Sequence, residues 1–255
     1  MTSQVPYSVP RAQPFYGPPP YAYRGCPQLI VLFRSSEEAI RELVPEPMVP
    51  NADDLAFLMI GSMVTDEFGT YDEAILAVPA SAGGVQGNHV VFHFVSTDKP
   101  MAAGREIMGW PKKLAELDWR AEGDAVTASC TRDGQPLIRA RGEMDGSIDP
   151  SALPLSPTWL NLKVIPSVLP DAPPDVAQLT GVTLTDLKVE EARGGRASLE
   201  LSSTATDPVS RLEVHEVVGA VVCRLSFDLP AGFVAHDYLG AGALAPALTG
   251  VGDAS

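Results

Sequence analysis

The chain is poor in positive charge and especially in lysine. Of its 255 residues, 18 are Lys or Arg and 32 are Asp or Glu, so the formal net charge is −14. A protein that binds DNA or RNA has to neutralise phosphates with a basic face. The composition therefore argues against a nucleic-acid partner.

Cysteine is scarce as well, and long apolar runs are missing. The chain has three cysteines, Cys26, Cys130 and Cys223, and no two of them have the short spacing of a zinc site or a redox pair. An odd number of widely separated cysteines favours a reducing compartment. The first residues lack the basic start and apolar run of a signal peptide, and no apolar stretch approaches the roughly 20 residues of a membrane-spanning helix. We expect a cytoplasmic protein without a membrane partner.

Composition divides the chain into three parts. Residues 1–23 carry six prolines and four tyrosines, which favours an extended arm laid on the body or on a neighbouring subunit. Residues 240–255 are mostly Gly and Ala without periodicity, and we expect a loose tail there. The 45% hydrophobic content of the whole chain is ample for a core, so residues 24–239 are expected to form a single domain.

Short apolar runs, β-branched or alternating, predict about nine strands and few helices. This pattern favours a mainly antiparallel α+β barrel or sandwich with helices attached. One helix is expected at "SSEEAIREL", where Ser35 and Glu38 form a capping-box pattern. A second is expected from Asp98, as a possible cap, to about Gly109.

Two of the five lysines are neighbours in the segment "GWPKKLAEL". Pro111 supplies no backbone donor and favours an extended conformation at Trp110, so the lysines are expected in a strand-like segment. Adjacent side chains of such a segment point to opposite faces. We therefore expect Lys112 and Lys113 to have different surroundings, one interior and one outside. The alternative from spacing alone is a pair of solvated surface lysines.

A buried lysine has chemistry that a solvated lysine lacks. An unperturbed amine with a pKa near 10.4 is almost wholly protonated at neutral pH and cannot attack a carbonyl. Burial can lower this pKa by roughly 3–5 pH units. The neutral amine then forms a Schiff base with a ketone, and the protonated imine nitrogen accepts electrons from a breaking C–C bond.

At these residues the chain resembles the acetoacetate decarboxylase family. "GREIMGWPKKLAE" is similar to the family's signature segment, and "FRSSEEAIRELVPEPM" to its N-terminal helix and following turn. "TYDEAILAVPASAGGVQGNHVVFHFV", "NLKVIP" and "HDYL" extend the resemblance over roughly residues 23–239. It implies a closed β-barrel of the acetoacetate decarboxylase type with a few attached helices. It also implies a homo-oligomer that acts on a small keto acid and needs no cofactor.

The resemblance assigns roles to three residues directly. Lys112 matches the lysine that forms the Schiff base, and Lys113 matches the neighbour held to lower its pKa. Because adjacent side chains diverge, we expect burial to matter at least as much as the charge of Lys113. Glu73, in "TYDEA", matches an active-site glutamate that orients a lysine or handles protons, and its alternative is a solvated carboxylate.

Substrate contacts are predicted at Trp110, Arg24 and Leu58. Trp110 stands beside the lysines in the signature segment. The family's decarboxylases use an arginine where Cys26 aligns, and Arg24, two residues earlier, replaces it if the chain shifts locally. They also use a second glutamate where an ungapped alignment places Leu58, and this departure puts decarboxylation in doubt.

Three functions remain open at this point. Decarboxylation of acetoacetate or a related β-keto acid is the first. The second is an aldolase-dehydratase that condenses pyruvate with an aldehyde through the same lysine, which Leu58 favours. The third is a non-catalytic barrel that binds a small ketone. We expect no metal site, because His89 and His93 lie about 13 Å apart if they share a strand.

Overall fold

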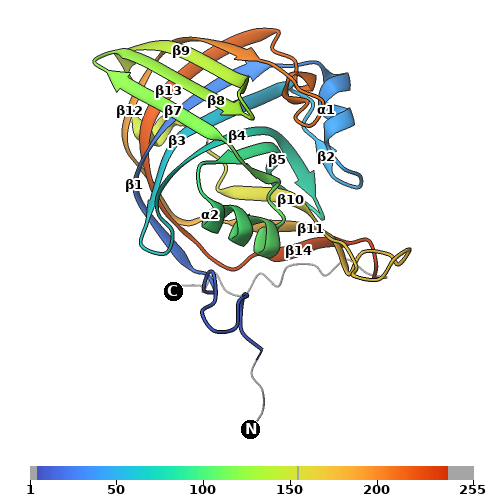
Figure 1. The fold of residues 1–255 in the computed structure, drawn as a ribbon. Coiled ribbons are helices and arrows are strands. Elements are labelled where there is room, and N and C mark those ends of the chain that lie inside the picture. Colours follow the sequence, from blue (N-terminus) through green and yellow to red (C-terminus); the bar gives the residue numbers. More distant parts are fainter. Residues whose placement is uncertain (1–4, 154, 241–255) are drawn as a thin grey trace, which may run out of the picture.

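Strands make up most of the computed structural model, which describes residues 5–153 and 155–240 (Figure 1). The first strands are β1 (Tyr21–Arg34), β2 (Val49–Pro50), β3 (Leu55–Thr65), β4 (Gly69–Ala82), β5 (Val85–Val95), β6 (Lys112–Leu114) and β7 (Glu116–Glu122). The others are β8 (Ala125–Arg132), β9 (Gln135–Ser147), β10 (Thr158–Ile165), β11 (Val176–Thr183), β12 (Thr185–Leu201), β13 (Glu216–Leu229) and β14 (Phe233–Asp237). The expected tail falls almost wholly outside the described residues.

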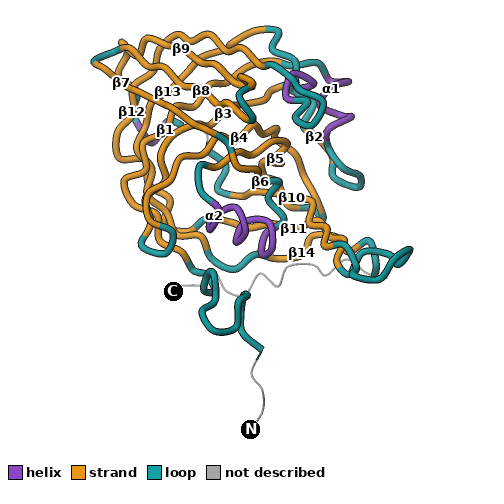
Figure 2. Tube along the Cα trace, in the orientation of Figure 1, coloured by secondary structure: helices purple, strands orange, loops and turns teal. Residues whose placement is uncertain are grey.

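Helices are short and few, as Figure 2 shows. They are α1 (Glu37–Leu43), α2 (Asp98–Ala103), the π-helix η1 (Gly104–Met108) and the 3₁₀ turns η2 (Pro150–Ala152) and η3 (Val209–Arg211). No helix in the described part of the chain is long and apolar enough to cross a membrane.

Both predicted helices exist, with small differences at their caps. The N-cap of α1 is Ser36, whose side chain accepts a hydrogen bond from the backbone N–H of Ala39, and not Ser35. Ser35 instead donates its backbone N–H to Asp54, which keeps it outside the helix. The second predicted helix consists of α2 followed by η1. Its N-cap position is Thr97 and not Asp98, and it ends at Gly109 as expected.

The predicted closed barrel is wrong. The sheet follows the order β14-β11-β10-β5-β4-β3-β1-β13-β12-β9-β8-β7, and its end strands β14 and β7 do not pair with each other. Closure would require hydrogen bonds between first and last strands at a fixed stagger. Here β7 contacts β3 through a side-chain hydrogen bond, in which Trp119 Nε1 donates to Ser62 Oγ. The result is a curled, mostly antiparallel sheet, with parallel pairs at β5–β10 and β5–β6 (Figure 1).

The curled sheet separates two apolar clusters. Side chains along β3 alternate between them, because neighbouring residues of a strand face opposite sides. Leu58 and Ile60 belong to one cluster, together with residues of β8, β9 and α1. Met59 and Met63 belong to the other, together with Tyr23 and residues of β13. The second side of the sheet holds the candidate site.

Candidate active site

Lys112 is buried at the first residue of β6. The short strand runs parallel to β5, which places Lys112 next to His93 and Lys113 next to Phe94. The Lys112 side chain is 2% exposed, so its amine has almost no contact with bulk water. Lysine is rarely buried without a specific partner, and the surroundings of the amine provide one.

Carboxylate and aromatic groups surround the amine. The Nζ atom of Lys112 lies 3.5 Å from Oε2 of Glu73 on β4. It also lies 4.8 Å from the ring centroid of Trp110 and 5.5 Å from that of Tyr71. The same Glu73 oxygen is 3.1 Å from Nε2 of His93, so the carboxylate bridges the lysine and the histidine.

Burial and the neighbouring charges together set the ionisation of this cluster. It lowers the pKa of Lys112, and the negative charge of Glu73 offsets only part of that effect. Burial by itself would raise the pKa of Glu73, but Lys112 and His93 outweigh it and the pKa is lowered. Burial also lowers the pKa of His93 to about 4. Around neutral pH the cluster therefore combines a charged carboxylate, a neutral histidine and an amine that gives up its proton more readily than a solvated lysine.

The π-helix η1 shapes the space beside the lysine. A Cβ atom on Gly104 would lie 2.8 Å from Cδ and 2.9 Å from Cε of Lys112, so only glycine fits there undisturbed. Arg105 donates to the backbone oxygen of Lys112 at 3.2 Å. Gly109 ends the helix with a φ of 75°, a conformation that favours glycine. Such π-helical turns are frequent at functional sites.

Lys113 points to the other side of the strand, as the alternation predicted. Its Nζ atom lies 2.7 Å from Oδ1 of Asp207, and its side chain is 41% exposed. Arg132 binds the second oxygen of the same carboxylate at 3.2 Å. Lys113 is thus held in an ion-paired cluster away from the Lys112 amine, and burial accounts for the lowered pKa of Lys112.

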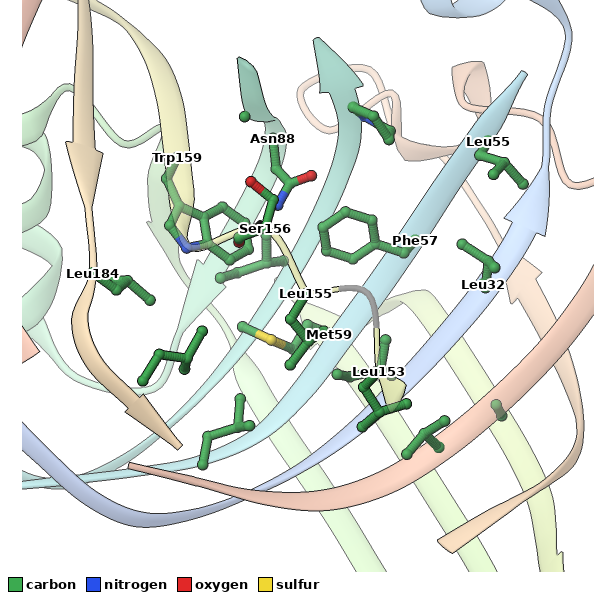
Figure 3. Close-up of a pocket in the computed structure, with 18 of the residues that line it drawn as sticks. Leu32, Leu55, Phe57, Met59, Asn88, Leu153, Leu155, Ser156, Trp159 and Leu184 are labelled. Carbon is green, nitrogen blue, oxygen red and sulfur yellow. Dashed lines mark hydrogen bonds between the residues drawn. The ribbon is translucent and has the colours of Figure 1, made fainter. Parts of the chain in front are cut away.

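A cavity of about 770 Å³ begins at this cluster. Glu73, Tyr71 and Trp110 line it next to the amine, which places Trp110 where sequence reasoning expected a substrate contact. In Figure 3 the side chains of Phe57, Met59 and Leu155 face a common space. Lys112 itself is not among the described lining residues, so a carbonyl compound in the cavity would lie against Glu73, Tyr71 and Trp110, the groups that surround the amine.

Arg24 and Leu58 lie outside this cavity. A bulge with Gly25 at a φ of 61° separates Tyr23 from Cys26 in β1, and both of these side chains join the cluster on the cavity side. Arg24 instead binds Asp228 and two backbone carbonyls, with its side chain 56% exposed. Leu58 is fully buried in the opposite cluster. We give neither residue a place in the proposed site.

Sequence reasoning missed His93 and Tyr71. The sequence suggests only a metal-ligand role for His93, because its pairing with Lys112 depends on a parallel register between segments that are separated by α2 and η1. Tyr71 lies two residues before Glu73 on the same strand, so period-two spacing was the available signal. Its hydroxyl lies 3.4 Å from that of Tyr23.

Comparisons with known proteins show which family the chain is similar to. The profile of the family described as "Acetoacetate decarboxylase (ADC)" matches residues 4–239. Acetoacetate decarboxylase 1 of Mesorhizobium japonicum is 35% identical over 239 residues, covering 91% of this chain and 95% of that protein. Acetoacetate decarboxylase of Bordetella avium is 32% identical over 238 residues, with coverage of 91% and 95%.

Solved structures show the same fold. The acetoacetate decarboxylase of Legionella pneumophila superposes with a TM-score of 0.85 at 27% identity, covering 94% of this chain and 99% of that one. The enduracididine biosynthesis enzyme MppR, complexed with the condensation product of pyruvate and imidazole 4-carboxaldehyde, has a TM-score of 0.81. At 18% identity, with coverage of 93% and 99%, it shows the fold alone. From the profile match and the curated relatives, the chain belongs to the acetoacetate decarboxylase family, as its lysine segment predicted.

Proposed function

We propose that this protein is a lysine Schiff-base lyase that decarboxylates acetoacetate or a related β-keto acid through Lys112. The observation that carries the proposal is the buried Lys112 amine, with its lowered pKa, 3.5 Å from Glu73, which lines one end of the cavity. The family match and the names of the curated relatives agree with this class of activity.

The reaction follows from the chemistry of the amine. Neutral Lys112 attacks the ketone carbon, water leaves, and a protonated imine forms. The bond between the carboxyl carbon and the α carbon then breaks. Its electron pair moves toward the iminium nitrogen, which gives an enamine and carbon dioxide. Protonation of the α carbon and addition of water release the ketone and restore the amine.

Glu73 and His93 have separate roles in this scheme. Glu73 touches the amine and can take up or return protons during imine formation and enamine protonation. His93 acts through Glu73, since its ring nitrogen holds the carboxylate oxygen that faces the lysine. We regard Glu73 as a catalytic residue and His93 as a positioning residue. Lys113 has no direct role in this proposal.

The aldolase-dehydratase alternative has one observation in its favour and one against it. No residue of β3 is acidic, so this strand supplies no second glutamate whatever the alignment. A pyruvate-condensing enzyme retains the substrate carboxylate, however, and an arginine is the usual partner for a retained carboxylate. Among the described residues that line the cavity, none is arginine. We therefore place decarboxylation first.

Borohydride reduction in the presence of a keto acid tests the proposal. Acetoacetate should leave a reduced adduct on Lys112, detected by intact mass and peptide mapping, and carbon dioxide should be released on turnover. Lys112→Ala should abolish both, whereas Lys188→Ala, which removes an exposed lysine, should not. A new enone absorbance with pyruvate and an aldehyde, without carbon dioxide, would favour the aldolase-dehydratase. No adduct with any keto acid would favour a non-catalytic binding protein.

Assembly, location and domain limits stay predictions. We propose a cytoplasmic homo-oligomer built from one domain over residues 24–239, with the N-terminal segment as an arm. In the described part of that segment Tyr16 is buried and its hydroxyl donates to Glu106 on η1, which supports an arm laid on the body. Light scattering of the purified protein measures the number of subunits.

A further inference from the structure

The cavity extends far beyond the Lys112 cluster along the strands. Ile75 on β4 pairs with Met59 on β3, which pairs with Ile30 on β1. Two residues further on, Phe57 on β3 pairs with Leu32 on β1. All five line the same cavity, so its wall continues as successive apolar cross-strand rows. Figure 3 shows Leu32, Phe57 and Met59 among these residues.

The length of the cavity can be read along β4. Glu73 and Pro79 both line it and lie on the same strand. Six residues of extended strand span roughly 20 Å. Asn51, Asp53 and Val218 line the cavity and are exposed, so this far part meets solvent. The cavity is therefore an elongated channel that has Glu73, the carboxylate in contact with the Lys112 amine, at one end.

The channel is mostly apolar, although Asn51, Gln86, Asn88 and Ser156 also line it, and none of its described residues is positively charged. Among the described residues that line it, Asp53 and Glu73 are the only charged ones. A second carboxylate on the substrate would find no cation along the wall, and a polar substituent would lose its hydration. A volume of about 770 Å³ also lies within the usual range of roughly 300–1,000 Å³ for sites that enclose drug-sized ligands. Acetoacetate, whose ketone carbon carries only a methyl group, would leave most of this space unused.

We propose that the substrate is a β-keto acid whose ketone carbon carries a long alkyl or aromatic group, and that the channel holds this group. The inference rests on the proposed Schiff-base chemistry at Lys112. The carboxylate and the ketone occupy the Glu73 end, and the apolar group lies between the rows of β1, β3 and β4. Loss of carbon dioxide then converts the acid into the methyl ketone that bears the same apolar group.

A substrate series tests this proposal directly. The purified protein is assayed for carbon dioxide release with acetoacetate, with β-keto acids bearing propyl, hexyl and decyl groups, and with benzoylacetate. We expect kcat/KM to rise about threefold to fourfold for each added methylene until the channel is filled, because each buried methylene contributes about that factor. The kcat/KM for benzoylacetate should also be higher than that for acetoacetate.

Gly219 offers a variant that shortens the channel. It lines the cavity opposite Leu32, and a Cβ atom there would meet no other atom within 4 Å. Gly219→Trp should lower the ratio of kcat/KM for the hexyl acid to that for acetoacetate by at least about tenfold. Val168→Trp adds the same side chain at a position that is 93% exposed, and this ratio should stay unchanged. Melting temperatures establish that both variants fold.

The outcomes separate this inference from the proposed function. If acetoacetate forms a reducible adduct and releases carbon dioxide, but longer acids do so with no higher kcat/KM, the inference fails while the proposed function stands. If no keto acid forms an adduct, the proposed function fails. If pyruvate together with octanal yields an enone and the β-keto acids release no carbon dioxide, the apolar group belongs to an aldehyde and the β-keto acid is excluded.

Discussion

Two opposing effects determine the pKa of the Lys112 amine. Burial lowers the pKa of the amine, and the Glu73 carboxylate raises it by a smaller amount. Only the neutral amine attacks a ketone, so imine formation should accelerate as the pH rises through the lowered pKa of Lys112. The acid limb of the pH profile should therefore lie below the ordinary pKa of lysine.

Glu73→Gln should move this acid limb to lower pH, because it removes the charge that favours the ammonium form. Turnover should fall by about 10²- to 10⁴-fold, the usual contribution of a general acid or base. The rate of borohydride-trapped adduct formation, followed by mass spectrometry across pH, measures the limb separately from turnover.

Lys113→Met is the matched control for the position of the acid limb. Because Lys113 is bound to Asp207 on the other side of β6, its removal should leave the limb where it is. An upward shift in this variant would show that the charge of Lys113, and not burial, lowers the pKa of Lys112.

At the scale of elements, the π-helix η1 decides where the amine lies. Gly104→Ala places a methyl group against Cδ and Cε of Lys112 and should displace its flexible end from Glu73. Small displacements of reacting groups cost up to about a hundredfold in rate, so we expect kcat to fall by roughly tenfold to a hundredfold. Steady-state kinetics and a melting curve test this together.

Gly17→Ala serves as the control for this substitution. Its added Cβ would meet Glu67 at 3.9 Å, an ordinary contact, so kcat should stay within about twofold. Equal losses of activity in the two variants would rule out a specific role for Gly104.

The Asp207 cluster ties together β6, β8 and the loop before η3. Burial would raise the pKa of Asp207, but hydrogen bonds from Lys113 and Thr206 and the nearby charges outweigh it, so the pKa is lowered. A carboxyl whose pKa is lower in the folded state stabilises the protein above its unfolded pKa. This contribution disappears as the pH falls through the lowered folded value.

Asp207→Asn should therefore reduce the free energy of unfolding by about 1–3 kcal/mol at neutral pH, with a smaller difference in acid. Urea unfolding of the parent protein and the variant at neutral and at acid pH measures this difference in the free energy of unfolding. Asp118→Asn removes an exposed carboxylate paired with Arg120 and should change stability by less than about 1 kcal/mol. A difference for Asp207→Asn that did not shrink in acid would contradict the ionic explanation.

At the scale of the whole molecule, the N-terminal segment contacts the π-helix. Tyr16 is buried and its hydroxyl donates to Glu106, 90 residues away in the chain. Deletion of residues 1–17 should lower the melting temperature and kcat together, because it uncovers η1 beside Lys112. Tyr16→Phe keeps the aromatic ring, so its melting temperature and its kcat should fall by less than those of the deletion variant. Unchanged kinetics in the deletion would mean that the arm does not support the site.

The sequence predicts about nine strands, whereas the described residues form fourteen, and the closed barrel could not be rejected from the sequence. Alternation within a strand is local, but closure depends on whether β14 and β7 meet, and these strands lie far apart in the chain. The predicted positions of Arg24 and Leu58 assume an uninterrupted register along β1 and β3. Gly25 forms a bulge that changes which residues of β1 face the cavity, and a shift of one residue on β3 exchanges the two clusters.

The sequence by itself determined that Lys112 and Lys113 diverge, because Pro111 favours extended chain and the period of an extended chain is local. It also identified the family, since the lysine segment is continuous in the chain. Only the tertiary structure decided which lysine is buried away from water, which carboxylate and histidine lie next to it, and how long the apolar channel is. These properties depend on contacts among β1, β3, β4, β5 and β13, and desolvation exists only once those segments have packed together.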